Sequence, residues 1–167
     1  MPLKFGIIDY QAGNLRNVQK AVERLGYTSD IISEDNFSES YSGLILPGVG
    51  SFKIGMDYLI KSGLFNFIKV SVLEKKVPIL GICLGMHLLA SEGDEGGFSE
   101  GLSLLPMKVE KFNVHKSKEK IPHMGWNNIF LNKKKSVLLE GIPNNSDFYF
   151  AHSYHVALET NNHITAF

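Results

Sequence analysis

The sequence predicts an α/β protein in three layers, with a mostly parallel central sheet and antiparallel strands added beside it. Two patterns along the chain support this prediction. Up to residue 90, short apolar runs alternate with stretches of helical periodicity, which is typical of parallel strands joined by right-handed helical crossovers. After Gly96, short strand-like runs alternate with turns rich in Gly, Asn and Lys. The length of 167 residues suits a single domain, residues 1–167, with a substantial core.

The first part of the chain contains alternating strand and helix signals. Strands are expected at residues 4–9, 28–32, 43–46 and 77–82. Helices are expected at residues 15–25, 59–73 and 83–90. In the first helix, apolar residues recur at spacings of three and four, which places them on one face, and Gly26 provides the stop. The second helix is expected to break near Gly63.

The second part of the chain reads as short strands. They are expected at residues 102–112, 127–131, 147–151 and 155–158. The lysine groups at 116–120 and 133–135 are expected to be the tips of turns, because short charged runs are usually solvated. We therefore expect these strands to form an antiparallel or mixed layer beside the parallel sheet.

Composition and charge exclude several classes of protein. Seventeen basic residues balance seventeen acidic ones, so nothing attracts the chain at long range to nucleic acid or to an anionic membrane. No apolar run approaches the roughly 20 residues that cross a bilayer, and the first residues read as a strand, not as a signal peptide. The single cysteine excludes an internal disulfide and favours a reducing compartment. We expect a cytoplasmic protein that binds neither nucleic acid nor membranes.

The segment GICLG, residues 81–85, places the single cysteine between two glycines at a predicted strand-to-helix corner. This G-x-C-x-G arrangement is the thiol form of the nucleophile elbow, in which the nucleophile takes unusual backbone angles and small neighbours let the chain turn. A thiolate at Cys83 would lie at a helix N-terminus, which favours its charge, and the N–H of Leu84 would face a developing oxyanion. Most lone cysteines are small buried hydrophobes instead, so the spacing leaves both interpretations open.

A second glycine-rich segment, LPGVGSF at residues 46–52, leaves a predicted strand at the edge where open α/β sheets build their sites. Gly48 and Gly50 allow the backbone to approach a ligand closely and a peptide to turn over. The N–H of Val49 is the best candidate for a second oxyanion donor. This segment also fits an ordinary tight turn, but beside the elbow the functional interpretation is favoured.

Five segments together resemble one family of enzymes. They are GICLGM, LPGVGSF, IIDYQAGNLRNVQKAVERLG, PHMGWN and FYFAHSYHV, which follow the family's spacing over the whole chain. On these segments the chain resembles the class I glutamine amidotransferases, and among them the glutaminase subunits of imidazole glycerol phosphate synthase in histidine biosynthesis. The resemblance implies the flavodoxin-like three-layer fold of that family and an activity that uses no cofactor and no metal.

The resemblance also implies roles for individual residues. Cys83 would attack the side-chain amide of glutamine, and water would then release glutamate from a thioester. Val49 and Leu84 would supply the oxyanion N–H groups. The residues that would hold the glutamine are Gly48, Gly50, His87, Glu95, Ser153 and Tyr154. The ammonia would pass to a partner synthase, a (β/α)₈ barrel, within a heterodimer. The residues that would face this partner are Asn14, Pro122, His123, Met124, Gly125 and Trp126.

Two departures from the family pattern matter. The family usually has Gln four residues after the nucleophile, where this chain has His87; an imidazole can still donate a hydrogen bond, so glutamine binding would survive with a changed pH dependence. The family carries its triad His and Glu in a His-Pro-Glu segment, which does not occur in residues 1–167. Neither His152 nor His155 matches the triad histidine, and both are expected to have structural and interface roles. We therefore expect a C-terminally incomplete domain with little or no glutaminase activity, since acid–base catalysis contributes roughly 10²- to 10⁴-fold.

Other functions stay open at this point. A paralogous subunit that feeds ammonia to another acceptor, such as a nucleotide or a surface sugar, fits the substitution at His87. A non-catalytic module that docks on a synthase through PHMGW fits the missing triad, although the intact elbow argues against it. A cysteine peptidase of similar fold is disfavoured because the sequence indicates no peptide groove. Metal binding is disfavoured because no two histidines have helical i, i+4 spacing.

Overall fold

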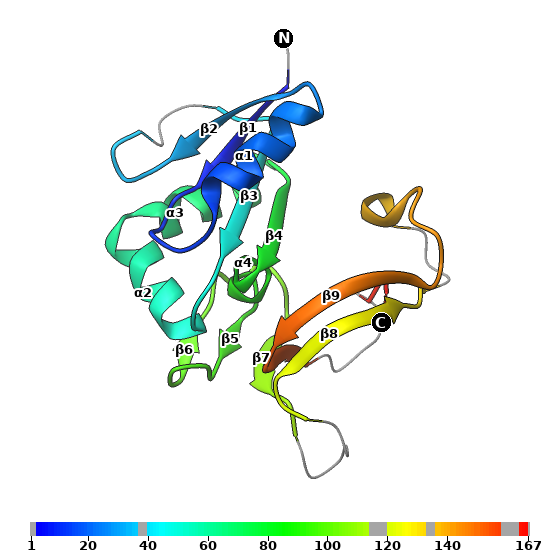
Figure 1. Ribbon diagram of the computed structural model, residues 1–167. Coiled ribbons are helices and arrows are strands. Elements are labelled where there is room, and N and C mark those ends of the chain that lie inside the picture. Colours follow the sequence, from blue (N-terminus) through cyan, green and yellow to red (C-terminus); the bar gives the residue numbers. More distant parts are fainter. Residues whose placement is uncertain (1–2, 37–39, 114–119, 133–135, 158–163, 167) are drawn as a thin grey trace.

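The structure, a computed structural model, describes residues 3–36, 40–113, 120–132, 136–157 and 164–166. Within these residues the strands form three sheets (Figure 1). Sheet A is parallel, sheet B is mixed, and sheet C is a two-stranded antiparallel ribbon. The expected α/β fold with a parallel sheet and added antiparallel strands is confirmed.

Sheet A contains the strands expected in the first part of the chain. They are β1 (Lys4–Ile8), β2 (Thr28–Ile32), β3 (Gly43–Gly48) and β4 (Ile79–Cys83). Their order is β2-β1-β3-β4, and every neighbouring pair is parallel. Because parallel strands end on the same side of a sheet, the segments that follow β1, β3 and β4 meet along one edge.

Helices cover both faces of sheet A. They are α1 (Leu15–Arg24), α2 (Phe52–Lys61), α3 (Leu64–Lys69) and α4 (Leu84–Leu88). Val22 of α1 packs with Ile7 and Ile45 in a small cluster on one face. The other three helices pack with Ile8 and Leu46 in the main core. Successive residues of a strand point to opposite faces. Ile7 therefore packs in the small cluster and Ile8 in the main core. Among the described residues, no helix is long and apolar enough to span a membrane.

The predicted helix at 59–73 had wrong bounds. α2 begins earlier, at Phe52, and a separate helix follows the break at Gly63, whose φ of 73° is left-handed. The sequence hides this start because Gly55 has poor helix propensity. In the structure this glycine lets α2 approach α4, since a Cβ there would lie 3.1 Å from Leu88 Cδ1. A π-helical turn, Val70–Glu74, continues α3 toward β4.

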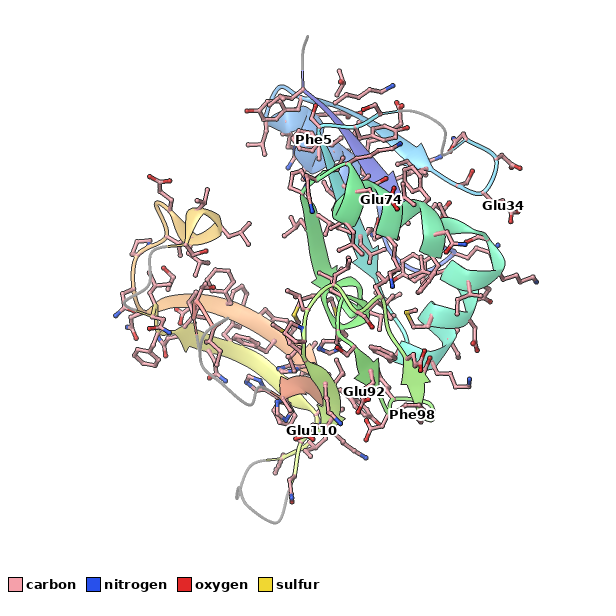
Figure 2. All side chains as sticks on the ribbon, turned by 180° about the vertical axis from the view of Figure 1, so that it is seen from behind. Phe5, Glu34, Glu74, Glu92, Phe98 and Glu110 are labelled. Carbon is pink, nitrogen blue, oxygen red and sulfur yellow. The ribbon has the colours of Figure 1, made fainter. Side chains whose placement is uncertain are left out.

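Sheets B and C contain the strands of the second part of the chain. Sheet B consists of β5 (Glu92–Gly93), β6 (Ser99–Glu100), β7 (Lys108–Lys111) and β10 (Tyr154–Ala157). Sheet C consists of β8 (His123–Ile129) and β9 (Ser146–His152). A 3-10 turn, Val137–Leu139, lies between them. Figure 2, seen from behind, labels Glu92 of β5 and Glu110 of β7, and sheet B lies between the helices and the β8–β9 ribbon.

Two of the strand predictions had wrong bounds. Residues 102–112 are strand only at 108–111, because Leu102 is fully buried in the main core and belongs to a loop that follows β6. The strand predicted at 127–131 begins at His123, so it includes most of the PHMGW segment. The strands predicted at 147–151 and 155–158 correspond to β9 and β10. Most of the two lysine groups lies outside the described residues.

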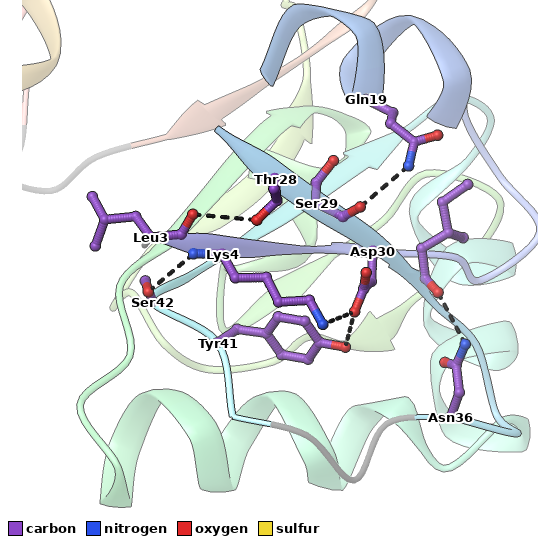
Figure 3. A network of polar contacts seen from close by, with 10 residues as sticks. Leu3, Lys4, Gln19, Thr28, Ser29, Asp30, Asn36, Tyr41 and Ser42 are labelled. Atoms are coloured by element: carbon purple, nitrogen blue, oxygen red, sulfur yellow. Dashed lines mark hydrogen bonds and ion pairs between the residues drawn. The ribbon is translucent and has the colours of Figure 1, made fainter. Parts of the chain in front are cut away.

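Polar contacts hold β2 at the outer edge of sheet A (Figure 3). Lys4 Nζ lies 2.5 Å from Asp30 Oδ2, and the hydroxyl of Tyr41 donates to the same oxygen at 3.3 Å. Asn36 Nδ2 donates to the carbonyl oxygen of Ile31 at 3.1 Å. β2 and β4 are the two opposite edges of the sheet, so this network stabilises the fold away from the cysteine.

Candidate active site

Cys83 lies at the sharp bend that the sequence predicts. It is the last residue of β4 and the N-cap of α4, and its thiol-bearing side chain is exposed. Its φ of 55° and ψ of −119° lie outside the regions that non-glycine residues normally occupy. Such strain costs about 1–3 kcal/mol and is found mainly at functional sites. The backbone at Cys83 therefore has the geometry of a nucleophile elbow.

The glycines on either side of the cysteine are required by close contacts. A Cβ at Gly81 would lie 2.5 Å from the Cα of Met86, because the chain turns back over the end of β4. A Cβ at Gly85 would lie 1.7 Å from the carbonyl oxygen of Leu46, because α4 packs directly on the backbone of β3. No side chain fits in either place, so both glycines bring the elbow close to the neighbouring strand.

The turn after β3 lies beside the elbow. In the parallel register Gly48 pairs with Cys83, so Val49 is the first residue past the strand at the level of the thiol. The side chain of Val49 is 63% exposed, and Gly50 has a φ of 109°, which favours glycine. Leu84 is buried and begins α4 directly after the nucleophile. The two predicted oxyanion donors therefore belong to backbone segments that meet at the cysteine.

Glu95, from the loop after β5, lies against the N-terminus of α2, the helix that follows this turn. Its Oε2 accepts a hydrogen bond from the N–H of Phe52 at 3.3 Å, and its carbonyl oxygen accepts one from the N–H of Lys53 at 3.1 Å. Partial burial raises the pKa of the Glu95 carboxyl, opposed by the hydrogen bond from Phe52. Desolvation, Asp94 and Glu95 raise the pKa of the Tyr154 hydroxyl. Glu95 and Tyr154, which are both predicted to hold the glutamine, therefore lie close enough for the charge of Glu95 to raise the pKa of Tyr154.

A chain of hydrogen bonds links the PHMGW segment to the HSY segment. His152 Nδ1 lies 2.9 Å from the carbonyl oxygen of Tyr154, so this nitrogen donates. His152 Nε2 then accepts from His123 Nδ1 at 3.0 Å, and His123 Nε2 accepts from Asn127 Nδ2. With the Asn127 amide donating, these bonds put a proton on Nδ1 of each ring. Ser153 is fixed from the other side, because its carbonyl oxygen accepts from the N–H of Phe112 at 3.1 Å.

His87 is a buried histidine at the position where the family usually has Gln. Its side chain is 8% exposed. Burial lowers its pKa from 6.5 to about 4, and the nearby His152 and His155 lower it further within that shift. His87 is therefore neutral at ordinary pH. The structure brings this residue together with the two histidines of the HSY segment.

The predicted partner-facing residues fall into two groups. On the β8–β9 ribbon Met124 is 64% exposed and Trp126 is 70% exposed, and the Trp126 ring contacts Tyr149 with centroids 5.6 Å apart. Gly125 has a φ of 145°, and the bond between Ile121 and Pro122 is cis. Asn14 lies elsewhere and caps α1, since its Oδ1 accepts from the N–H of Asn17 at 3.2 Å. Asn14 therefore has a structural role as a helix cap, and its contact with the partner stays a prediction.

Two features of the site were missed from the sequence. One is the histidine chain, which depends on the pairing of β8 with β9, where His123 is opposite His152. The other is Tyr10, a buried residue whose pKa is raised by burial and by the nearby Cys83. Its position at the C-terminal end of β1, on the edge where sites form, was the available signal. Within the described part of the chain, no three His, Cys, Asp or Glu side chains are grouped to hold a metal ion.

Replacing His87 by Gln should remove part of the acid sensitivity of the fold. Between pH 6.5 and about 4, the unfolded chain binds a proton at His87 that the folded chain does not bind, so stability falls as the pH is lowered through this window. The expected slope from this one residue approaches about 1.4 kcal/mol per pH unit. Urea midpoints of the wild type and His87→Gln across this window measure it. Parallel curves for the two proteins would show that His87 is not a buried neutral group.

Comparison with known proteins places this geometry in a family. The family model "Glutamine amidotransferase class-I" matches residues 6–167. The imidazole glycerol phosphate synthase subunit HisH 1 of Campylobacter jejuni is 47% identical over 150 residues, which cover 90% of this chain and 74% of that protein. Subunit HisH of Moorella thermoacetica is 45% identical over 150 residues, covering 90% of this chain and 69% of that protein.

Solved structures agree on the fold. A crystal structure of a glutamine amidotransferase superposes with a TM-score of 0.69 at 18% identity, covering 97% of this chain and 78% of that one. The structure of PurLQS from Thermotoga maritima gives a TM-score of 0.68 at 18% identity, covering 99% of this chain and 74% of that one. With the family model spanning nearly the whole sequence and relatives above 40% identity, this chain belongs to the class-I glutamine amidotransferase family.

Proposed function

We propose that this chain is the glutaminase subunit of an imidazole glycerol phosphate synthase, which releases ammonia from glutamine in histidine biosynthesis. One observation carries the proposal: the strained cysteine at the elbow is paired in register with the glycine before the Val49 turn. Family membership and the names of the similar subunits support it. An exposed thiol flanked by the backbone of the Val49 turn and of the α4 N-terminus suits acyl transfer from an amide.

The chemistry follows from the elbow. The sulfur of Cys83 attacks the side-chain amide carbon of glutamine, and the carbonyl oxygen takes up negative charge. The N–H groups of Val49 and Leu84 stabilise that charge. The C–N bond then breaks, the departing nitrogen takes up the proton that the thiol has released and leaves as ammonia, and a thioester remains. Water hydrolyses the thioester to glutamate and restores the thiol. In the family a His-Pro-Glu segment supplies the acid and base. Because residues 1–167 contain no such segment, we expect these residues alone to turn over glutamine slowly or not at all.

The substrate is held by groups around the elbow. In this proposal the Glu95 carboxylate pairs with the ammonium group of glutamine, which its position next to the α2 N-terminus and Tyr154 supports. Gly50 and the backbone of Ser153 and Tyr154 complete the cradle. Neutral His87 replaces the usual Gln as a hydrogen-bonding group.

The ammonia passes to a partner subunit. The similar proteins are named as subunits of a synthase, and we propose a heterodimer with a (β/α)₈-barrel synthase in the cytoplasm. The exposed face of the β8–β9 ribbon suits this contact, because exposed aromatic residues and methionine are enriched at protein interfaces. The histidine chain connects this ribbon with the carbonyl oxygen of Tyr154.

A reactive cysteine should be recognised by a substrate-shaped reagent. We expect the diazoketone analogue of glutamine to alkylate Cys83 faster than it alkylates free cysteine, and excess glutamine to slow the reaction, because the site binds the amino-acid part of the reagent. Mass spectrometry of the wild type and Cys83→Ser provides the measurement, with iodoacetamide as the unselective control. Selectivity equal to that of free cysteine would refute a glutamine site.

Trp126 should be an anchor for the partner. Because its side chain is 70% exposed, Trp126→Ala should leave the fold intact while it weakens binding to the barrel subunit roughly thirtyfold or more, which corresponds to about 2 kcal/mol. Titration calorimetry measures this affinity. Leu138→Ala, at an equally exposed apolar residue on the 3-10 turn, is the matched control. Equal affinities for the two variants would remove Trp126 from the interface.

A further inference from the structure

Tyr10 is an unusual residue for the interior of this fold. Its side chain is 1% exposed, and its hydroxyl finds no hydrogen-bond partner among the described residues. A buried polar atom without a partner lowers stability, and native proteins contain few of them. A phenylalanine would fill the same space without this loss. The hydroxyl therefore calls for a reason other than packing.

The hydroxyl lies between the two backbone segments of the proposed oxyanion site. A Cβ at Gly48 would come within 1.9 Å of the Tyr10 hydroxyl oxygen. The same position is 3.0 Å from the backbone nitrogen of Gly85 and 3.1 Å from the Cβ of Leu84. The hydroxyl thus occupies the space that a side chain at position 48 would take, with the Val49 turn on one side and the elbow on the other.

The loop after β1 holds the ring in this place. Asp9 Oδ1 accepts from the N–H of Gln11 at 3.0 Å, and Gln11 has a left-handed φ of 65°, so the chain turns sharply around Tyr10. Gly13 then packs on the turn itself, because a Cβ there would lie 3.4 Å from the backbone nitrogen of Gly48. The loop, the ring and the turn form one packed unit.

The Tyr10 hydroxyl stays protonated, although it has no acceptor among the described residues. Burial raises the pKa of Tyr10 well above its ordinary value, and the negative charge of a Cys83 thiolate raises it further. The phenol therefore keeps its proton wherever the enzyme is folded and the thiol is ionised. A neutral O–H dipole beside a strained cysteine and a glycine turn is suited to orient them.

We propose that Tyr10 is a positioning residue for the glutaminase reaction: its hydroxyl sets the separation and orientation of the Gly48–Val49 turn and the Cys83–Leu84 elbow. This inference rests on the proposed function, since it names the group that keeps the two oxyanion donors aligned. It also accounts for the glycine at position 48, where any side chain would displace the hydroxyl. The hydroxyl lowers the stability of the fold because it is buried without a partner, and its role in the reaction explains why it is kept.

The test is Tyr10→Phe, which removes the hydroxyl and leaves the ring. The maximal rate of Cys83 alkylation by the diazoketone analogue should fall about tenfold, less than the roughly 10²- to 10³-fold effect of removing an oxyanion donor itself. The concentration for half-maximal rate should stay within about twofold, because binding of the amino-acid part is untouched. The iodoacetamide rate should be unchanged, and the thermal midpoint should stay equal or rise.

Tyr41→Phe is the matched control. Tyr41 is also buried, but its hydroxyl donates to Asp30 at the far edge of sheet A. This variant should have a lower thermal midpoint and an unchanged alkylation rate. Unchanged diazoketone kinetics in Tyr10→Phe would overturn the positioning role while leaving the proposed function standing. A wild type that reacts no more selectively than free cysteine would overturn the proposed function, and the role of Tyr10 with it. Equal slowing of both reagents with a lower midpoint would show a merely structural role.

Discussion

The left-handed backbone at Cys83 is the constraint on which the rest of the site depends. A residue with a side chain is forced to a φ of 55° at the end of a parallel strand. The chain can adopt this bend only because positions 81 and 85 are glycines, since a Cβ at either would collide with the backbone of Met86 or Leu46. In turn, the register of β3 with β4 brings Gly48 beside the thiol. One strained residue thereby fixes three backbone segments around a small space.

Packing of the core around the site offsets the free energy that this arrangement costs. The bend stores about 1–3 kcal/mol of backbone strain, and the Tyr10 hydroxyl adds a buried polar group without a partner among the described residues. The main core beneath the site is continuous, from Phe52 and Met56 in α2 to Leu88 in α4. Burial of large apolar side chains stabilises the fold by roughly 1.5–3 kcal/mol each, which is enough to hold local strain of this size.

The sequence predicted those parts of the site that depend on local chemistry. Glycines around Cys83 and Val49 report sharp turns and close approaches, and the alternation of strands and helices reports the parallel sheet that aligns them. Parts that depend on long-range pairing were not predicted. The bond between His123 and His152 needs the register of β8 with β9, and the two-residue strands β5 and β6 carry too little pattern to be recognised. The position of Tyr10 just after β1 marks it as a candidate site residue, but no local pattern shows that its hydroxyl is buried.

A crystal structure of the protein alkylated at Cys83 by the diazoketone analogue of glutamine tests the central claim most directly. The claim predicts that the ketone oxygen of the adduct accepts hydrogen bonds from the N–H groups of both Val49 and Leu84, each within about 3.2 Å. An adduct whose oxygen faces solvent, with neither backbone N–H within reach, would contradict it.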